Sequence, residues 1–159
     1  QHNQHNQIDN IYENIYNNKY LRNCVLESVR LFNLVITSFR TLEQNYKFPD
    51  YNKVFKKGTQ FLILNNPILR DKIVFKNPNR FNPLRWTSDL EKSYNAISFN
   101  QGPQRCPGKE MTIFLTQSFI YNFINIYNIN INTNIDCIKI NSNNVPQIIN
   151  PCKIFFKIN

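Results

Sequence analysis

The sequence predicts a mostly helical α+β fold, and three observations support this fold class. Residues 18–32 and 108–124 place apolar side chains at the three- and four-residue spacing of an amphipathic helix. Between them lie two short runs that favour β-strands, residues 34–39 and 61–64. Hydrophobic residues make up 42% of the 159-residue chain and charged residues 18%, which is typical of a globular protein rather than a disordered one.

The first predicted helix begins with Asn17 or Asn18 as its N-cap. The residues 1–17 are mostly polar and repetitive, which predicts a flexible stretch, and His2 and His5 fit a solvated tail better than a metal site. The predicted buried face of the helix consists of Leu21, Cys24, Val25, Ser28, Leu31 and Phe32.

The segment between the helices is predicted to be a small sheet followed by irregular loop. A Lys57-Gly58-Thr59 turn precedes the second strand run. Pro67, Pro78 and Pro83 then interrupt a stretch rich in Asn, Arg and Phe, which indicates a chain without regular structure. At the end of the sequence, Asn alternates with Ile and two prolines indicate turns, so we expect a small antiparallel hairpin there.

The second predicted helix begins at Gly108 or Lys109 and ends near Ile124. Large apolar residues recur along it at near-helical spacing, and we expect them to face the core. This predicted buried stripe consists of Met111, Phe114, Leu115, Phe119 and Phe123.

The formal net charge of +9 indicates an anionic partner. Lys and Arg are scattered, with no run longer than Lys56-Lys57, and no predicted helix carries a basic stripe, so nucleic acid is not expected as a ligand. The sequence has neither an unbroken apolar run of about twenty residues nor a signal-peptide pattern at its start. Since it begins without Met, we expect a fragment or a matured piece.

The four cysteines are widely spaced, without the paired ligands that a structural zinc site needs. Cys24, Cys137 and Cys152 are expected to be ordinary buried thiols. Cys106 differs, because two of the three glycines in the chain, Gly102 and Gly108, flank it and a predicted helix follows directly. These glycines indicate backbone with positive φ or a close approach to another group.

The position of Cys106 before a helix N-terminus favours an anion, so its thiolate form should be stabilised there. Such a thiolate can act as a nucleophile or as a metal ligand. Both histidines lie far away in the sequence, at the N-terminus, so a Cys–His catalytic pair is not favoured. Metal ligation is therefore the better interpretation of Cys106, and an inert buried thiol is the alternative.

The segment around Cys106 resembles a known family. Phe99, Gly102, Cys106 and Gly108 match the pattern F-x-x-G-x-x-x-C-x-G, which is the cysteine-ligand loop of the cytochrome P-450 family of haem-thiolate enzymes.

Two further segments are similar to motifs of the same family and occur in the same order. Glu27-Ser28-Val29-Arg30 looks like the E-x-x-R motif, on the first predicted helix. Phe81 to Trp86 is similar to the aromatic-x-Pro-x-Arg-aromatic segment that precedes the ligand loop. The resemblance therefore implies the C-terminal part of the cytochrome P-450 fold: the E-x-x-R helix, a small sheet, an irregular meander, the cysteine loop, the following helix and a hairpin. Residues 18–159 would be the haem-binding part of a single larger domain.

The resemblance implies that Cys106 is the proximal ligand of the iron in haem b (iron protoporphyrin IX), where a thiolate favours O–O cleavage. Phe99 would pack beside the sulfur, and Gly102 and Gly108 would let the loop approach the porphyrin.

Propionate contacts are implied for two more positions. Arg40 would reach a propionate, for which a guanidinium is well suited, and a plain surface charge is its alternative. Gln104 stands where the family usually places Arg or His, and Arg105 is displaced from that position by one residue. Since adjacent side chains on an extended loop point in opposite directions, Arg105 is expected to face outward.

The family resemblance also implies that Glu27, Arg30 and Arg85 form a buried charged cluster that fixes the scaffold of the loop. Loss of one member of such a cluster costs about 3–5 kcal/mol, because a buried charge is left unpaired. Taken alone, Glu27 and Arg30 would be read as an exposed i,i+3 pair worth a few tenths of a kcal/mol, and Arg85 as a solvated loop residue.

The implied activity is activation of O2 for the oxidation of an apolar small molecule, with Val35, Ile36 and Thr37 lining the substrate side. The distal helix of the family is not among these residues, so we expect that this chain alone is not a competent monooxygenase. Two alternatives stay open. One is a haem-thiolate isomerase or dehydratase, and the other is a non-catalytic fragment or basic binding module that takes no haem.

The resemblance further implies an electron-donor protein, either a flavin reductase or an iron–sulfur protein, at the cysteine side of the haem. We expect an intracellular protein, with any membrane anchor in a segment outside these residues. The cations near the loop in sequence, which would form the docking face, are Lys76, Arg80, Lys92, Arg105 and Lys109.

Overall fold

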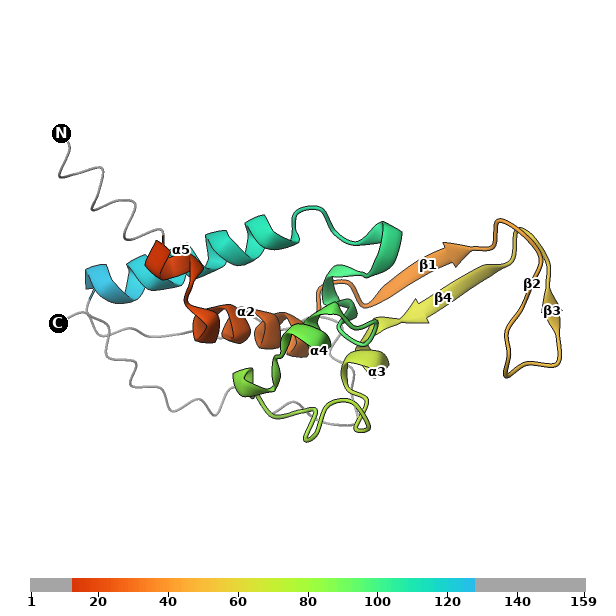
Figure 1. The fold of residues 1–159 in the computed structure, drawn as a ribbon, viewed down its shortest axis with the longest axis horizontal. Coiled ribbons are helices and arrows are strands. Elements are labelled where there is room, and N and C mark those ends of the chain that lie inside the picture. The colour runs from red at the N-terminus through yellow and green to blue at the C-terminus, as the bar shows by residue number, and fades with distance from the viewer. Residues whose placement is uncertain (1–12, 128–159) are drawn as a thin grey trace.

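The computed structural model describes residues 13–127 and combines helices with a long two-stranded ribbon (Figure 1). This arrangement confirms the predicted α+β class. The predicted C-terminal hairpin, His2 and His5 lie outside the described residues. The longer helices are α2 (Lys19–Leu31) and α5 (Lys109–Tyr127), the short helices are α3 (Asn65–Leu69) and α4 (Ser88–Lys92), and the strands are β1 (Thr37–Thr41), β2 (Tyr46–Lys47), β3 (Val54–Phe55) and β4 (Gln60–Leu64).

Helix α2 begins as the sequence predicts, but its buried face is different. The side chain of Asn18 accepts a hydrogen bond from the backbone N–H of Leu21 at 2.9 Å, which makes Asn18 the N-cap. Ser28 was expected to be buried and is exposed, whereas Glu27 and Arg30 are completely buried. The buried face is shifted because these two charged side chains have partners inside the protein.

The strand prediction is correct in place and inexact in length. Strand β1 pairs with β4 in antiparallel register, from Thr37 opposite Leu64 to Thr41 opposite Gln60. The expected strand at residues 34–39 starts three residues too early, because residues 34–36 have no strand partner. Gly58, in the predicted turn, has φ +84°, a conformation that favours glycine.

The outer end of the ribbon was not predicted. Strands β2 and β3 pair there as a second small sheet, and Figure 1 shows them projecting away from the helices. Each strand has only two residues, too few for the period-two pattern of a strand to be visible in the sequence. Edge-to-face contacts between Phe48, Phe55 and Phe61 hold this end together.

The meander after the ribbon is largely irregular, as the prolines predicted, apart from short helical turns, which are α3, a 3₁₀ turn at Pro83–Arg85 and α4. Pro67 lies inside helix α3. It occupies the first turn, where a backbone N–H has no helical acceptor, so the missing donor costs nothing there.

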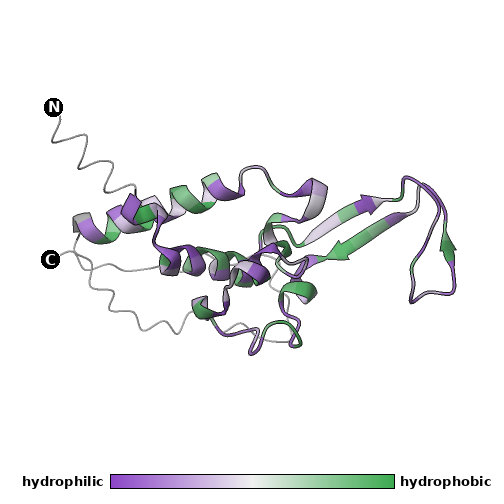
Figure 2. Ribbon diagram, viewed as in Figure 1, coloured by the Kyte–Doolittle hydropathy of each residue, from purple (hydrophilic) through white to green (hydrophobic). Residues whose placement is uncertain are grey.

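Helix α5 begins at Lys109, as predicted, but the expected buried stripe is only partly correct. Phe114 and Phe123 are half-buried, whereas Met111, Leu115 and Phe119 are 64%, 58% and 67% exposed. The buried positions are Lys109, Ile113 and Gln117. Hydrophilic and hydrophobic residues are mixed along α5 (Figure 2), so apolar spacing alone does not identify the side that packs on α2. No helix within residues 13–127 is long and apolar enough to span a membrane.

The apolar core lies between α2, α5 and the meander. Its buried members are Val25 and Leu26 of α2, Ile113 of α5, and Trp86 and Ala96 of the meander, and Phe99 packs against them. Because Phe99 opens the segment that carries Cys106, the core fixes one end of the cysteine loop.

Candidate cysteine-ligand site

Cys106 lies in a tight loop between a 3₁₀ turn at Ile97–Phe99 and the start of α5. Its backbone N–H donates a hydrogen bond to the carbonyl of Phe99 at 2.8 Å, which closes the loop. Its side chain is half-buried. Asn100 and Gly102 both have positive φ, +56° and +68°, so two left-handed residues produce the sharp bend.

The two glycines of the loop serve different purposes. Gly102 has positive φ, and a Cβ there would lie 3.0 Å from the hydroxyl oxygen of Tyr94. Gly108 does not have positive φ, but a Cβ there would lie 3.9 Å from the Cys106 sulfur. A Cβ at Gly108 would therefore be in van der Waals contact with the sulfur, and glycine leaves that side of Cys106 without a side chain.

Arg40 is brought to the loop by strand β1, although it is far away in the sequence. Its guanidinium donates to the side-chain oxygen of Asn100 at 3.3 Å and to the carbonyl of Phe39 at 2.7 Å. Arg40 therefore lies beside the cysteine loop, and its contact with a propionate stays a prediction. Gln104 and Arg105 are both exposed.

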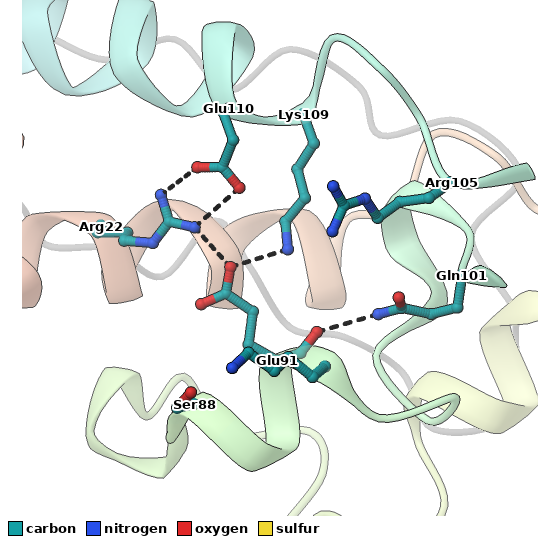
Figure 3. A pocket seen from close by; sticks show the side chains of 8 residues that line it. Arg22, Ser88, Glu91, Gln101, Arg105, Lys109 and Glu110 are labelled. Atoms are coloured by element: carbon teal, nitrogen blue, oxygen red, sulfur yellow. Dashed lines mark hydrogen bonds and ion pairs between the residues drawn. The ribbon is translucent and has the colours of Figure 1, made fainter. Parts of the chain in front are cut away.

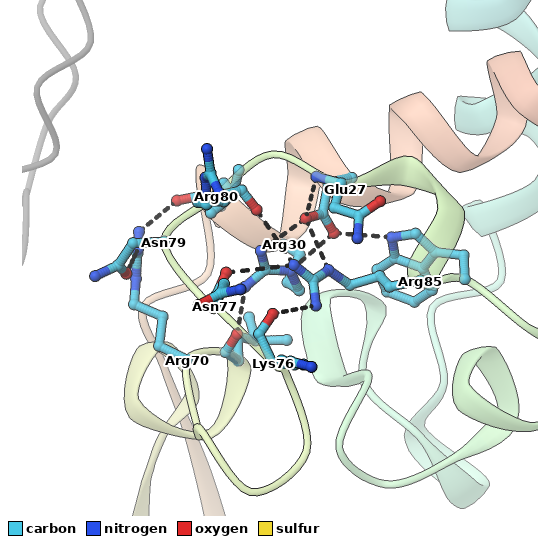
Figure 4. Close-up of polar contacts among 12 residues, drawn as sticks. Glu27, Arg30, Arg70, Lys76, Asn77, Asn79, Arg80 and Arg85 are labelled. Atoms are coloured by element: carbon cyan, nitrogen blue, oxygen red, sulfur yellow. Dashed lines mark hydrogen bonds and ion pairs between the residues drawn. The ribbon is translucent and has the colours of Figure 1, made fainter.

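Glu27 is the centre of a buried charged cluster (Figure 4). Its carboxylate accepts two hydrogen bonds from Arg30, at 2.8 and 2.9 Å, and one from Arg85 at 3.0 Å. The side chains of Glu27 and Arg30 have no exposed surface and that of Arg85 has 8%. The structure thus brings together the three residues of the predicted cluster, from helix α2 and the meander, and rules out an exposed pair.

The two arginines connect this carboxylate to the rest of the meander. Arg85 also donates to the carbonyl oxygens of Lys76, Asn77 and Arg80. Arg30 donates to the carbonyl of Leu69 at 2.8 Å. The cluster therefore holds the irregular segment in one conformation. Its arginine side chains bind backbone carbonyl oxygens that helices and strands would pair with backbone N–H groups.

Sequence reasoning missed several partners of the cluster. The indole N–H of Trp86 donates to Glu27 at 3.0 Å, and the backbone N–H of Asn82 donates to it at 3.0 Å. The guanidinium of Arg30 also lies 5.0 Å from the ring centre of Phe75. Trp86 was visible as the last aromatic of the family segment, but nothing in the pattern indicated that its N–H binds Glu27.

Burial alone would raise the pKa of Glu27, but hydrogen bonds from Arg30, the backbone of Asn82 and Arg85 lower it below the usual carboxyl value. Glu27 is consequently ionised at neutral pH, and its charge is balanced inside the protein.

Of the residues predicted to line the substrate side, Val35 and Ile36 lie just before β1 and Thr37 is its first residue. Val35 is 45% exposed, while Ile36 and Thr37 are half-buried. The amide of Asn65 donates to the carbonyl of Val35 at 2.9 Å, and its backbone N–H donates to the carbonyl of Ile36 at 2.9 Å. Asn65 is completely buried, so the backbone of this short segment is fixed while the Val35 side chain faces outward.

A polar cavity of about 380 Å³ lies beside the cysteine loop (Figure 3). Arg105 lines it, so its side chain faces this cavity and the surface. Lys92 lines it as well and is exposed. Lys109 was expected to be part of a free basic face, but its side chain is 10% exposed and its ammonium binds Glu91 at 2.8 Å. Lys109 therefore does not belong to such a face. Lys76 and Arg80 line a separate hollow beside Arg85.

Cys24, the other cysteine within residues 13–127, has different surroundings. It is half-buried in helix α2. Burial raises the pKa of its thiol, and a hydrogen bond with Tyr20 opposes this shift only in part. Cys24 is therefore an ordinary protonated thiol.

The structure thus contains a thiol on a tight loop and, separately, a buried carboxylate bound by two arginines, the two features on which the family resemblance rests. The family model of cytochrome P450 matches residues 2–156, and the chain belongs to this family of haem-dependent monooxygenases.

Individual relatives agree with this assignment. The chain is 30% identical over 112 residues to 7,8-epoxymelianol synthase of Ailanthus altissima, which covers 70% of this chain and 22% of the relative. It is 28% identical over 108 residues to beta-amyrin 11-oxidase of Glycyrrhiza uralensis, covering 68% and 22%. The chain thus spans about a fifth of the length of these curated relatives.

Solved structures show the same fold. The chain is similar to cytochrome P450-153 from Novosphingobium aromaticivorans, with a TM-score of 0.56 and 18% identity over 76% of this chain and 29% of that one. The haem domain of cytochrome P450DA gives a TM-score of 0.59 and 19% identity, over 67% and 24%. These likenesses confirm that the chain has part of the cytochrome P450 fold.

The residues present fit the cofactor of this family. Cys106 would hold the iron of a haem through its sulfur, because it is a thiol on a loop where the next glycine places no side chain beside the sulfur. Arg40 lies against Asn100 of the same loop and offers a guanidinium of the kind that binds carboxylates.

Proposed function

We propose that this chain is the haem-thiolate part of a cytochrome P450 monooxygenase, in which Cys106 is the axial ligand of the haem b iron. The observation that carries the proposal is the geometry of the loop. The backbone N–H of Cys106 is bound to Phe99, two residues with positive φ bend the chain, and Gly108 leaves the sulfur uncovered.

In this proposal the haem, when bound, supplies the chemistry of O2 activation. The protein residues have separate tasks. Cys106 would hold the iron and donate electron density to it, Phe99 would pack beside the sulfur, and Arg40 would pair with a propionate. Gln104 is a weaker propionate partner, because an amide lacks the charge that Arg or His provides in the family.

The substrate proposed for the whole protein is an apolar small molecule. Support comes from the exposed apolar side chains before β1, where Leu34 is 93% and Val35 45% exposed. The names of the relatives describe a synthase of an epoxide and an oxidase, which are oxidative activities. The distal wall of the site would be supplied by sequence beyond this chain, so the chain alone should give uncoupled or peroxidase-like reactivity.

The proposed electron donor is an acidic protein, a flavin reductase or an iron–sulfur protein, and its docking face must be smaller than the sequence suggested. Lys92 and Arg105 are exposed beside the cysteine loop and have no carboxylate partner among the described residues, whereas Lys109 is already paired. Neutralising Lys92 and Arg105 together should weaken the salt dependence of reduction. An unchanged salt dependence would exclude this face.

The proposal is tested by adding haemin, reducing the iron and recording the carbon monoxide difference spectrum. The wild type should give the spectrum of thiolate ligation, and Cys106→Ala should lose it. Cys24→Ala is a matched control, because Cys24 is also half-buried, and it should keep the wild-type spectrum. Equal thiolate-type spectra in wild type and Cys106→Ala would refute the ligand assignment, and no haem uptake by the folded wild type would favour a binding module without haem.

A further inference from the structure

The polar cavity beside the cysteine loop is organised around Glu91, which belongs to the short helix α4 (Figure 3). One oxygen of its carboxylate, Oε1, accepts from both the Lys109 ammonium, at 2.8 Å, and the Arg22 guanidinium. The backbone carbonyl of Glu91 accepts from the side-chain amide of Gln101 at 3.0 Å. A single residue of the meander thus binds side chains from three other segments.

Two of these partners lie at opposite ends of the cysteine loop. Gln101 is at its start, and a second bond from its amide to the carbonyl of Ala96, at 3.4 Å, links it to the core. Lys109 is at its end, where its backbone N–H lies 3.4 Å from the carbonyl of Cys106. Glu91 therefore holds the segment that carries the sulfur on both sides.

Glu91 is well suited to act as a charged anchor. Its side chain is 21% exposed and that of Lys109 is 10% exposed, so both charges are largely removed from water. Burial alone would raise the pKa of Glu91, but hydrogen bonds from Lys109 and Arg22 lower it below the usual carboxyl value. The carboxylate is ionised at neutral pH and neutralises the Lys109 ammonium, which has Glu91 as its ion-pair partner.

We propose that Glu91 is a positioning residue for the Cys106 ligand, which it places by binding Gln101 and Lys109 at the two ends of the loop. This inference rests on the function proposed for Cys106. Without the carboxylate, the nearly buried Lys109 ammonium would face the Arg22 guanidinium without a counter-charge. The start of α5 would then move away from α4, and Cys106 would move with it.

Glu110 provides a matched control within the same cluster. It also binds Arg22, through two hydrogen bonds of 2.8 and 3.2 Å, but its side chain is 60% exposed. It binds neither Gln101 nor Lys109 in any contact of the described residues. Glu91→Gln and Glu110→Gln therefore remove the same charge from the same arginine, but only the first also removes the ion pair with Lys109 at the end of the loop. The bond from Gln101 to the backbone carbonyl of residue 91 stays in both variants.

The experiment uses the haem-loaded protein, expressed with its natural flanking sequence, and measures two quantities. The first is the ratio of the thiolate-ligated form to the protonated or detached sulfur form in the carbon monoxide difference spectrum. The second is amide hydrogen exchange in peptides covering residues 100–109. Glu91→Gln should lower the ratio about three- to tenfold and accelerate exchange, while Glu110→Gln should match the wild type. Equal behaviour of the two variants in both measurements would overturn the proposal.

Two further variants distinguish a loss of Cys106 positioning from a general loss of protein stability. Glu91→Asp keeps the charge and should recover part of the thiolate-ligated fraction. The double variant Glu91→Gln with Lys109→Met leaves no unpaired ammonium and should also recover part of it. If Glu91→Gln does not fold, Gln101→Met tests the other end of the loop and should shift both measurements in the same direction. Failure of all three predictions for the folded variants would overturn the inference.

Failure of the underlying function gives a different result. If the folded wild type shows no thiolate-type spectrum, the assignment of Cys106 fails. Amide exchange of residues 100–109 without haem would still report whether Glu91 holds the loop, since Glu91→Gln should accelerate it and Glu110→Gln should not.

Discussion

Within residues 13–127, two carboxylates each bind two basic side chains, and they differ mainly in burial. Glu27 has no exposed side-chain surface, and it accepts bonds from Arg30, Arg85, Trp86 and the backbone of Asn82. Glu91 is 21% exposed and binds Lys109 and Arg22, which are 10% and 23% exposed. One of these two carboxylate clusters therefore lies in the interior, and the other lies at the edge of a cavity.

This difference determines what each carboxylate does. In the interior, water cannot replace a lost partner, so each bond to Glu27 contributes strongly to the free energy of folding. At the cavity, water can hydrate part of a broken pair, so the energetic cost is smaller. We infer that the Glu27 cluster determines whether the meander folds and that Glu91 adjusts where the folded loop lies.

The largest effect is expected for Glu27→Gln, which leaves the buried guanidinium of Arg30 without a counter-charge. The substitution should reduce the free energy of unfolding by about 3–5 kcal/mol, a large part of the stability of a small domain. Urea denaturation followed by circular dichroism measures this loss. A loss similar to that of an exposed pair would show that the interior cluster has no special importance.

Acid should weaken the Glu27 cluster in a defined pH range. The pKa of Glu27 is lowered in the folded protein, so its contribution is complete above the ordinary carboxyl pKa, 4.5, and is lost as pH falls through the lower folded value. The pKa of Glu91 is also lowered, so its contribution to the free energy of unfolding is likewise lost as pH falls. Urea midpoints measured from pH 7 to pH 3 should therefore fall below about pH 4.5. Arg85→Lys should flatten this dependence, because it removes a bond that lowers the pKa of Glu27.

The two clusters also differ in how far the sequence could predict them. Glu27 and Arg30 lie one helical turn apart, and together with Arg85 they belong to family segments in a fixed order, so their association followed from the pattern. Glu91 and Lys109 belong to no such pattern. Their contact depends on how α4 and α5 are brought together by the tertiary fold, which one sequence without its structure does not reveal.

The errors on helix α5 have a related cause. Met111, Leu115 and Phe119 have helical spacing, but they face outward, and the polar Gln117 is buried instead. The amide of Gln117 donates to the carbonyl oxygens of Ile15 and Asn18, at 3.0 and 3.3 Å, and these bonds allow its burial. Apolar periodicity cannot anticipate a buried polar residue whose acceptors come from the start of the described chain.

A medium effect is expected for Arg85→Lys, which keeps the charge and removes the planar group. The ammonium cannot bind Glu27 and the carbonyl oxygens of Lys76 and Arg80 at the same time with the geometry of a guanidinium. The loss should be about 1.5–3 kcal/mol. Trp86→Phe is a useful comparison, since it removes one bond to Glu27 without changing charge. If Arg85→Lys costs less than Trp86→Phe, the charge and not the geometry of Arg85 matters.

The smallest effects are expected at the cavity, where Glu91→Gln should cost about 1 kcal/mol and Glu110→Gln less than about 0.5 kcal/mol. Glu110 is 60% exposed, so water replaces most of what its pair with Arg22 provides. Both variants should unfold at nearly the wild-type urea concentration. Comparison of these midpoints with those of Glu27→Gln tests the role of burial directly. If Glu91→Gln destabilises the protein as much as Glu27→Gln, Glu91 is part of the folding scaffold and the distinction between the two carboxylates is wrong.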